Sequence, residues 1–407
     1  MRKQVRGEAA GVSPKDRLHV LESSRRHKMA RSAHAYIRGN TLKFYEWLEA
    51  GAGAKLPQGP PIWICGDCHV GNLGPVADSD GRVEIEIRDL DQTVIGNPAH
   101  DLIRLGLSLA TAARGSDLPG VTTAHMMEHM IAGYEKAMAS PRAADKLPEG
   151  EIRSIDAVMQ RALKRRWRHL AEERIEDVTP SIPLGRRFWA LAPEERKSID
   201  ELFETDEARA MVTNLNRDTK DAKVKVVDAA YWMKGCSSLG RLRYAVLLRV
   251  GPKREKRFCL IDIKEAVLAA APASLPKKSK AQDFAERVVA GACALSPYLG
   301  ERMMAATLLR RPVVVRELMP QDLKLEIERL TCDEAVAAAE YLATVVGRAH
   351  ARQMDAKTRR RWRNELKLHR PKDLEAPGWL WSSVVELVAS HEAAYLEHCR
   401  RFARASA

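Results

Sequence analysis

The sequence predicts an α+β fold in which a larger region is mostly helical and a smaller region is built on an antiparallel sheet, and we call these regions the large lobe and the small lobe. Apolar residues alternate over 241–250, and a turn leads to a second short apolar run over 258–263, which is typical of a strand hairpin. The segments 101–113 and 122–139 carry instead the dense apolar residues of packed helices. A chain of 407 residues, 45% of them apolar, can fill one large core or two ordinary ones.

The composition indicates a basic protein that has no membrane-spanning segment. The net charge is +13, which suits a phosphate-bearing ligand or nucleic acid but is also common on ordinary cytosolic proteins. The first residues are polar, and no run of about 18 apolar residues occurs, so we expect neither secretion nor a transmembrane helix. Seven scattered cysteines fit reduced thiols. We therefore expect a cytoplasmic protein without a membrane partner.

The order of the patterns divides the chain into five segments. Residues 1–28 are charged, and we expect a flexible N-terminal segment there. The other segments are the first part of the large lobe, a proline-punctuated helical insertion, the small lobe, and C-terminal helices that complete the large lobe, at 29–139, 140–220, 221–320 and 321–407. Within them we expect helices at 29–50, 101–113, 122–139, 281–295 and 331–353, and strands at 61–65, 73–76, 83–87, 241–250, 258–263 and 313–318.

Polar residues cluster where the first predicted strand ends. Gly66 breaks that strand, and Asp67 and Asn72 then lie five positions apart in a loop. The next two strands form a hairpin around the turn at 78–81, and Asp89 follows the second of them. The hairpin brings the two carboxylates and the amide to one end. Such oxygen ligands suit Mg²⁺ that is also held by phosphate oxygens.

The same residues resemble the catalytic core of the protein-kinase-like phosphotransferases, in which a D-x-x-x-x-N loop precedes a metal-binding Asp. The pattern Gly66-Asp67-x-His69-x-x-Asn72 is most similar to the aminoglycoside and choline phosphotransferase branch. The resemblance implies that Asp67 is the catalytic base, with His69 in the same motif, and that Asn72 and Asp89 bind the metal. It also implies that Asp101 and Asp91 support the site. The match departs at Arg88 and Leu90, where those enzymes usually carry apolar and aromatic residues.

The small lobe carries a second part of this resemblance. A glycine-rich turn, a hairpin and a terminal lysine are how a kinase small lobe covers the phosphates of ATP. Here the nucleotide-binding residues would be four in the turn, one at the end of the hairpin and one acidic partner on the next helix: Gly235, Ser237, Ser238, Gly240, Lys264 and Glu286. Ser237 replaces the usual middle glycine, and Glu286 can equally be a surface residue. The expected ligands are ATP and Mg²⁺.

The order of these parts is reversed relative to kinases, since the catalytic loop precedes the glycine-rich turn. Together with the block Ser32 to Gly39 and the block Arg287 to Gly291, this order resembles the bacterial domain-of-unknown-function family 2252, from about residue 29 to 353. The 140–220 region matches poorly. That family is grouped with the kinase-like fold, so the resemblance implies a circularly permuted, two-lobed, protein-kinase-like fold.

A competing interpretation starts from the cysteines. Cys65-x-x-Cys68-His69 has the form of a c-type haem attachment sequence or of half a zinc site. Haem attachment needs an exported compartment, and zinc needs two further ligands that no second Cys-x-x-Cys supplies. A third interpretation is an ordinary glycine-rich corner between a strand and a loop.

Two classes of function follow from these patterns. The first is an Mg²⁺–ATP phosphotransferase, or a nucleotidyl-transferring relative, acting on an unknown small-molecule or protein acceptor. The second is a non-catalytic nucleotide- or nucleic-acid-binding protein. The basic stretch 164–169 could bind nucleic acid or be a solvated helix face. Arg38 could touch a phosphate or be exposed or ion-paired. His350 could be functional or merely packed, and Trp379 and Trp381 are predicted packing anchors.

Overall fold

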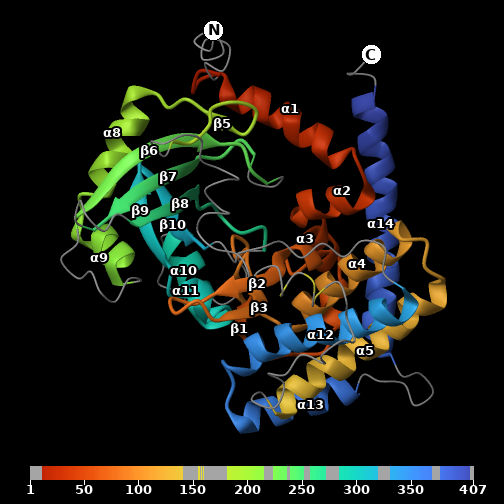
Figure 1. Ribbon diagram of the computed structural model, residues 1–407. Helices are drawn as coiled ribbons and strands as arrows, with labels where there is room; N and C mark the ends of the chain where they lie inside the picture. The colour runs from red at the N-terminus through yellow and green to blue at the C-terminus, as the bar shows by residue number, and fades with distance from the viewer. Residues whose placement is uncertain are drawn as a thin grey trace.

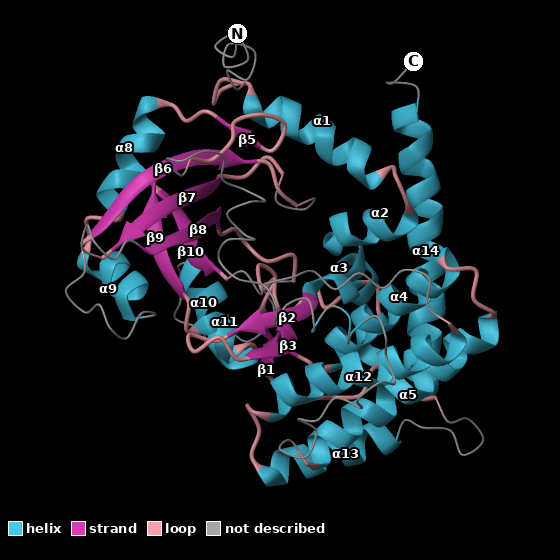
Figure 2. Cartoon of the chain, viewed as in Figure 1, coloured by secondary structure: helices cyan, strands magenta, loops and turns pink. Residues whose placement is uncertain are grey.

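A computed structural model describes residues 12–140, 155, 157, 159, 181–214, 223–235, 239–251, 257–271, 284–319, 331–368 and 376–403. The fold is mixed α+β, as predicted. Figures 1 and 2 show most strands gathered in a twisted sheet on one side and the long helices on the other. Across the described ranges, no helix is both long and apolar enough to cross a membrane.

The small lobe is a six-stranded antiparallel sheet in the order β5-β6-β7-β8-β10-β9. Its strands are β5 (Phe188–Trp189), β6 (Val224–Trp232), β7 (Arg243–Val250), β8 (Arg257–Glu265), β9 (Met303–Leu308) and β10 (Arg311–Leu318). The helices α8 (Pro193–Leu202) and α9 (Asp206–Asn214) cover one face, where Ile199 and Val212 share a core with Val246 and Ile261. Residues 181–214, which the sequence analysis places in a helical insertion, therefore belong to the small lobe.

The large lobe packs helices around two short strand pairs. The helices are α2 (Ala33–Gly39), α3 (Thr41–Glu49), η1 (Ala52–Lys55), α4 (Ala99–Gly115), α5 (Gly120–Ala139), α12 (Cys332–Ala351), α13 (Ala356–Leu368) and α14 (Gly378–Ala403). The strand pairs are β1 (Ile62–Ile64) with β4 (Val94–Gly96), and β2 (Leu73–Ala77) with β3 (Val83–Ile87). Helix α4 is buried on nearly all sides, and each of its leucines and its isoleucine belongs to the apolar core.

Helices α5 and α12 lie against each other at two glycines. A Cβ on Gly133 would lie 2.2 Å from the carbonyl oxygen of Glu340, and one on Gly347 would lie 2.8 Å from the Cβ of Ala137. Only glycine allows the backbones to approach this closely. The N-terminus of α12 is a capping box between Thr331 and Glu334, as its spacing predicts.

The lobes are joined by α10 (Phe284–Leu295) and α11 (Pro297–Gly300) and by the N-terminal helix α1 (Arg17–Met29). Figure 1 shows α1 running from the sheet to the end of α14. Arg17 forms a buried ion pair of 2.6 Å with Glu195, and Leu21 enters the core of the sheet. The expectation of a flexible segment is therefore wrong for residues 17–28. Leu21 is the one buried leucine among the charged residues of this helix, so the sequence shows no helical repeat of apolar residues there.

Most predicted elements are confirmed within four residues of their ends, but no bounds were predicted for β4, β5, β6 and β9. Trp379 is buried, as expected, whereas Trp381 is exposed, so the second packing anchor is wrong. The basic stretch 164–169 lies outside the described residues.

Candidate functional site

Gly66 shapes the loop that follows β1. Its φ is +73°, and a Cβ there would lie 2.1 Å from the carbonyl oxygen of Gln92. Both the left-handed backbone and this close approach require glycine. The hydroxyl of Tyr45 donates to the Gly66 carbonyl at 2.8 Å, which fixes the turn from the other side. The chain therefore leaves the strand in one direction, toward Asp67.

One face of α4 holds this loop through three polar residues in an otherwise apolar helix. Asp101 accepts hydrogen bonds from the backbone N–H groups of Cys65 at 2.7 Å and Gly66 at 3.0 Å. Arg104 holds the carboxylate of Asp67, and the hydroxyl of Ser108 accepts from the N–H of Val70 at 3.2 Å. Positions i, i+3 and i+7 lie on one side of a helix. The predicted bracing role of Asp101 is therefore seen in its contacts.

Asp101 is itself held by a buried chain of hydrogen bonds. His350 Nε2 lies 3.1 Å from Asp101 Oδ2, and His350 Nδ1 lies 2.9 Å from the hydroxyl of Tyr134. The indole of Trp362 donates to that hydroxyl at 3.1 Å. With Nε2 donating to the carboxylate, Nδ1 accepts from the tyrosine. His350 is thus a packed residue that connects α12 to the loop.

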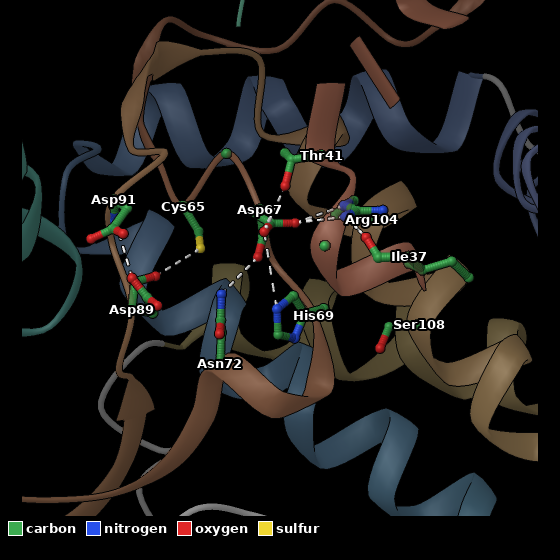
Figure 3. Close-up of polar contacts among 12 residues, drawn as sticks. Ile37, Thr41, Cys65, Asp67, His69, Asn72, Asp89, Asp91, Arg104 and Ser108 are labelled. Atoms are coloured by element: carbon green, nitrogen blue, oxygen red, sulfur yellow. Dashed lines mark hydrogen bonds and ion pairs between the residues drawn. The ribbon is translucent and has the colours of Figure 1, made fainter. Parts of the chain in front are cut away.

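Asp67 is buried at the centre of the site, and both of its carboxylate oxygens have partners. Arg104 Nε donates to Oδ1 at 2.9 Å, and the Thr41 hydroxyl donates to Oδ2 at 2.8 Å (Figure 3). Burial raises the pKa of Asp67, while Arg104 and Thr41 favour its charged form. Asp67 is therefore a fixed carboxylate, oriented by two donors from different helices.

Asn72 and Asp89 lie beside Asp67, as the hairpin predicts (Figure 3). The side-chain amide nitrogen of Asn72 donates to the main-chain carbonyl of Asp67 at 3.0 Å. The main-chain carbonyl of Asn72 accepts from the N–H of Arg88 at 2.7 Å. The thiol of Cys65 lies 3.6 Å from the carbonyl of Asp89. The side chain of Asp89 is 43% exposed, so its oxygens can reach a ligand.

Lys264 joins the two lobes at this point. It stands at the end of β8 and reaches Asp89, 175 positions away, with its Nζ 3.3 Å from Oδ1, and it also forms an ion pair with Asp91. Burial opposes the ionisation of Asp89, but the charges of Lys264 and then Arg243 outweigh it, so the pKa of Asp89 lies below its usual range. The predicted lysine and the predicted metal-binding Asp are thus neighbours.

His69 lies below Asp67 in the view of Figure 3 and is 3% exposed. Its Nε2 is 4.0 Å from Asp67 Oδ2, too far for a hydrogen bond, and its buried Nδ1 has no hydrogen-bond partner. Burial, with the charges of Arg38 and Arg104, holds the pKa of His69 well below its ordinary value. The ring is therefore neutral at pH 7.

A comparison with protein families gives one match, which spans residues 17–401. The family is described as an uncharacterized protein conserved in bacteria, DUF2252. The chain belongs to this family. Comparisons with curated proteins and with solved structures give no match. The family assignment made from the sequence blocks is confirmed, and the match extends over a longer part of the chain than those blocks.

The structure describes some of the residues predicted to bind the nucleotide in this DUF2252 chain and not others. Gly235 and Gly240 both have positive φ, at 89° and 95°, as a tight turn requires, while Ser237 and Ser238 lie outside the described residues. Glu286 is exposed on α10, and the ion pairs of Lys264 within the described chain are with Asp89 and Asp91. The predicted Lys264–Glu286 pair is therefore wrong.

Arg287, the next residue on α10, takes the inward position instead. Its guanidinium donates to the carbonyls of Asp91 and Val267, both at 2.9 Å, and to that of Thr93. It therefore fixes the chain after Asp89. The sequence analysis used Arg287 only to recognise the family and assigned it no role.

The cysteines of the DUF2252 loop are free, wholly buried thiols. Both thiols belong to the core cluster of the large lobe. Among the described residues, no group of three or more His, Cys, Asp or Glu side chains is arranged to hold a metal ion.

Sequence reasoning missed Arg104, Thr41 and the position of Arg38. A signal for Arg104 was present, because a charged residue three positions after Asp101 in an apolar helix must find a partner on the same face. Thr41 had no such signal, since it lies 26 positions from Asp67 in a separate helix.

Proposed function

We propose that this protein is an Mg²⁺–ATP-dependent phosphotransferase with a permuted kinase-like fold that acts on a small-molecule or protein acceptor in the cytoplasm. One observation carries the proposal. Lys264 of the sheet meets Asp89 and Asp91 of the helical lobe beside the Asp67–Asn72 loop, and these are the side chains that a kinase uses for the phosphates, the metal and the acceptor.

The arrangement of the sheet supports the kinase-like fold. In protein kinases the phosphate-binding lysine stands on the third strand of the small lobe and a helix follows that strand. Here Lys264 ends β8, the third strand of the β6-β7-β8 meander, and α10 is the next described element. The catalytic loop precedes this sheet in the sequence, which is the permuted order.

The chain offers suitable ligands for Mg²⁺. Asp89 supplies an ionised, partly exposed carboxylate. Asn72 uses its amide nitrogen within the loop, and its amide oxygen makes no hydrogen bond in the described part of the chain. Two hard oxygen ligands, with phosphate oxygens and water, are a normal magnesium site. A bound Mg²⁺ would neutralise charge on the phosphates during transfer.

The remaining residues have distinct roles in the proposed reaction. Asp67 would orient the acceptor hydroxyl and take its proton as the new O–P bond forms and the bond from the γ-phosphorus to the β–γ bridging oxygen breaks. Lys264 would bind the phosphates of ATP, from which ADP leaves. Arg104 and Thr41 would hold the Asp67 carboxylate in one orientation.

A specific observation favours the second candidate, a non-catalytic nucleotide-binding protein. Both oxygens of Asp67 already have partners, and Arg104 compensates its charge inside the fold. Each of these donors occupies a position on the carboxylate that an acceptor hydroxyl would otherwise use. This candidate predicts Mg²⁺–ATP binding without turnover.

Four variants distinguish these functions. Asp67→Asn should keep the affinity for Mg²⁺–ATP but lower ADP release, measured with a metabolite extract as the source of acceptor, by a factor of about 10²–10⁴. Asp89→Asn should weaken binding that depends on Mg²⁺, because it removes a charged ligand. Lys264→Ala should weaken nucleotide binding without changing the metal requirement. Lys197→Ala, on the exposed side of α8, is the matched control and should behave like the parent.

Calorimetry measures binding, and mass spectrometry of the products identifies transfer. A parent protein that binds no Mg²⁺–ATP overturns the proposal. Binding without ADP release in the parent selects the non-catalytic candidate. Equal behaviour of the Asp67, Asp89 and Lys264 variants and the parent would remove these residues from the site.

A further inference from the structure

The guanidinium of Arg38 lies directly against the catalytic loop. A Cβ added to Gly71 would lie 3.0 Å from Arg38 Cζ and 3.2 Å from its Nε and Nη2. Arg38 is half-buried, and its buried Nε has no hydrogen-bond partner. Among the described residues Arg38 forms no ion pair, so the exposed or ion-paired arginine allowed by the sequence is not what the structure contains. No carboxylate in the described part of the chain pairs with its charge.

Three hydrogen bonds from side chains fix the backbone of the helix that carries Arg38. Ser32 caps the start of α2 by accepting from the N–H of Ala35 at 3.1 Å. At the other end, Arg104 donates to the carbonyl of Ile37 at 2.8 Å and Arg25 donates to that of Gly39 at 2.9 Å. The position of Arg38 over Gly71 therefore follows from the placement of α2.

More positive than negative groups act on His69, which shares this place with Arg38. Arg38 and Arg104 both lower the pKa of His69 and Asp89 acts in the opposite direction, while Arg104 already compensates Asp67. The buried Nη1 of Arg104 and the buried Nδ1 of His69 have no hydrogen-bond partner. Buried donors without partners are uncommon in native proteins and often mark a missing ligand. A cationic acceptor would be repelled here, and an anionic one would be attracted.

Arg104 and the proposed nucleotide residues lie on opposite sides of Asp67. Figure 3 shows Asp89 and Asp91 on one side of Asp67, and Arg104 and Ile37 on the other. Arg38 follows Ile37 on α2, and its guanidinium reaches the loop at Gly71.

We propose that Arg38 and His69 form an anion-binding subsite for the acceptor, so that the acceptor is a molecule carrying a phosphate or carboxylate group. A guanidinium binds either anion through two parallel hydrogen bonds, and His69 can donate from Nδ1 while it is neutral. The assignment of the bound molecule as the acceptor rests on the proposed phosphotransferase function, whereas the anion subsite does not depend on that function.

Inorganic phosphate and acetate are the probes, titrated calorimetrically into the full chain with and without saturating Mg²⁺–ATP. Arg38→Gln should raise the dissociation constant of the bound anion at least tenfold, and Arg38→Lys should have a smaller effect because it keeps the charge but loses the two-pronged contact. Arg31→Gln removes the same charge from an exposed position just before α2 and should change it less than twofold. The thermal midpoint of each variant checks folding.

The outcomes separate the two proposals. An anion that binds together with Mg²⁺–ATP and depends on Arg38 supports the acceptor subsite. An anion that competes with Mg²⁺–ATP belongs to the nucleotide's phosphate site and overturns it, as does a parent that binds neither probe. Anion binding through Arg38 in a parent that binds no Mg²⁺–ATP keeps the anion subsite and removes the phosphotransferase.

Discussion

At the scale of single residues, Gly66 decides where the loop 66–72 begins. Replacing it with alanine places a methyl group in a left-handed backbone and against the Gln92 carbonyl. The backbone alone should cost about 1–2 kcal/mol of unfolding free energy, and the collision a further ~1–3 kcal/mol. Urea unfolding of Gly66→Ala measures the total.

Gly81 provides the matched control. Its φ of +80° is close to the +73° of Gly66, but a Cβ there meets nothing within 4 Å. Gly81→Ala should therefore lose only the backbone part. Equal losses for the two variants would mean that the Gln92 contact does not constrain the loop.

The sequence could predict the acidic residues of the site because their positions are fixed by local spacing. Asp67 and Asn72 share one loop, and Asp89 follows a hairpin whose register is set by alternation. Lys264 needed the resemblance as well, since 175 positions separate it from Asp89. Glu286 failed because adjacent helix positions point in different directions, and Arg287 occupies the inward one.

At the scale of secondary-structure elements, α12 reaches Asp101, which holds the loop 66–72, through His350. His350→Phe keeps an aromatic ring but leaves the Asp101 carboxylate and the Tyr134 hydroxyl without this partner. Losing the partners of two buried polar groups should cost about 2–4 kcal/mol. Hydrogen exchange of the Cys65 and Gly66 amides, which donate to Asp101, should become faster.

His129→Phe tests the same pair of helices at the surface. His129 on α5 lies 3.0 Å from Glu340 on α12, and its side chain is 49% exposed. An exposed pair of this kind is worth about 0–1 kcal/mol. If both histidine variants lose the same stability with unchanged amide exchange, α12 does not brace the loop.

Elements with a clear period or cap were predictable, and elements defined by tertiary contacts were not. The alternation of β7 and the capping box of α12 are local signals. Strand β4 has three residues and exists because it pairs with β1, and β9, on the edge of the sheet, fully buries only one of its six residues. Helix α1 is fixed by Arg17 and Leu21 on the sheet, which its charged sequence does not reveal.

At the scale of the whole molecule, the two lobes meet through charged side chains. Besides Lys264, the guanidinium of Arg316 donates to the Arg88 carbonyl at 3.0 Å, and the Tyr298 hydroxyl donates to Glu84 at 2.9 Å. Apolar residues also cross this junction, because Val314 of β10 and Val288 and Leu295 of α10 belong to the core cluster of the large lobe. The chain therefore reaches the junction from β3, α10, α11 and β10.

Glu86 makes this junction sensitive to pH. It is 3% exposed on β3, accepts from the Ser296 hydroxyl at 2.6 Å, and lies 3.7 Å from Arg352. Burial raises the pKa of Glu86 to about 7. Below its ordinary pKa of 4.5 the carboxyl is protonated in both the folded and the unfolded states. As the pH rises toward 7, the unfolded state loses the proton first, so the folded state loses stability.

Glu86→Gln removes this dependence, because the amide stays neutral at every pH. The variant should unfold like the parent near pH 4.5 and be more stable by roughly 2–3 kcal/mol at pH 8. Urea unfolding at intervals from pH 4.5 to pH 8 measures the difference. Glu84→Gln, on the half-buried neighbour of the same strand, removes a negative charge that also raises the pKa of Glu86, so it should reduce the slope only in part. A difference between Glu86→Gln and the parent that is constant with pH would contradict the prediction, since the Glu86 carboxyl would then titrate alike in both states.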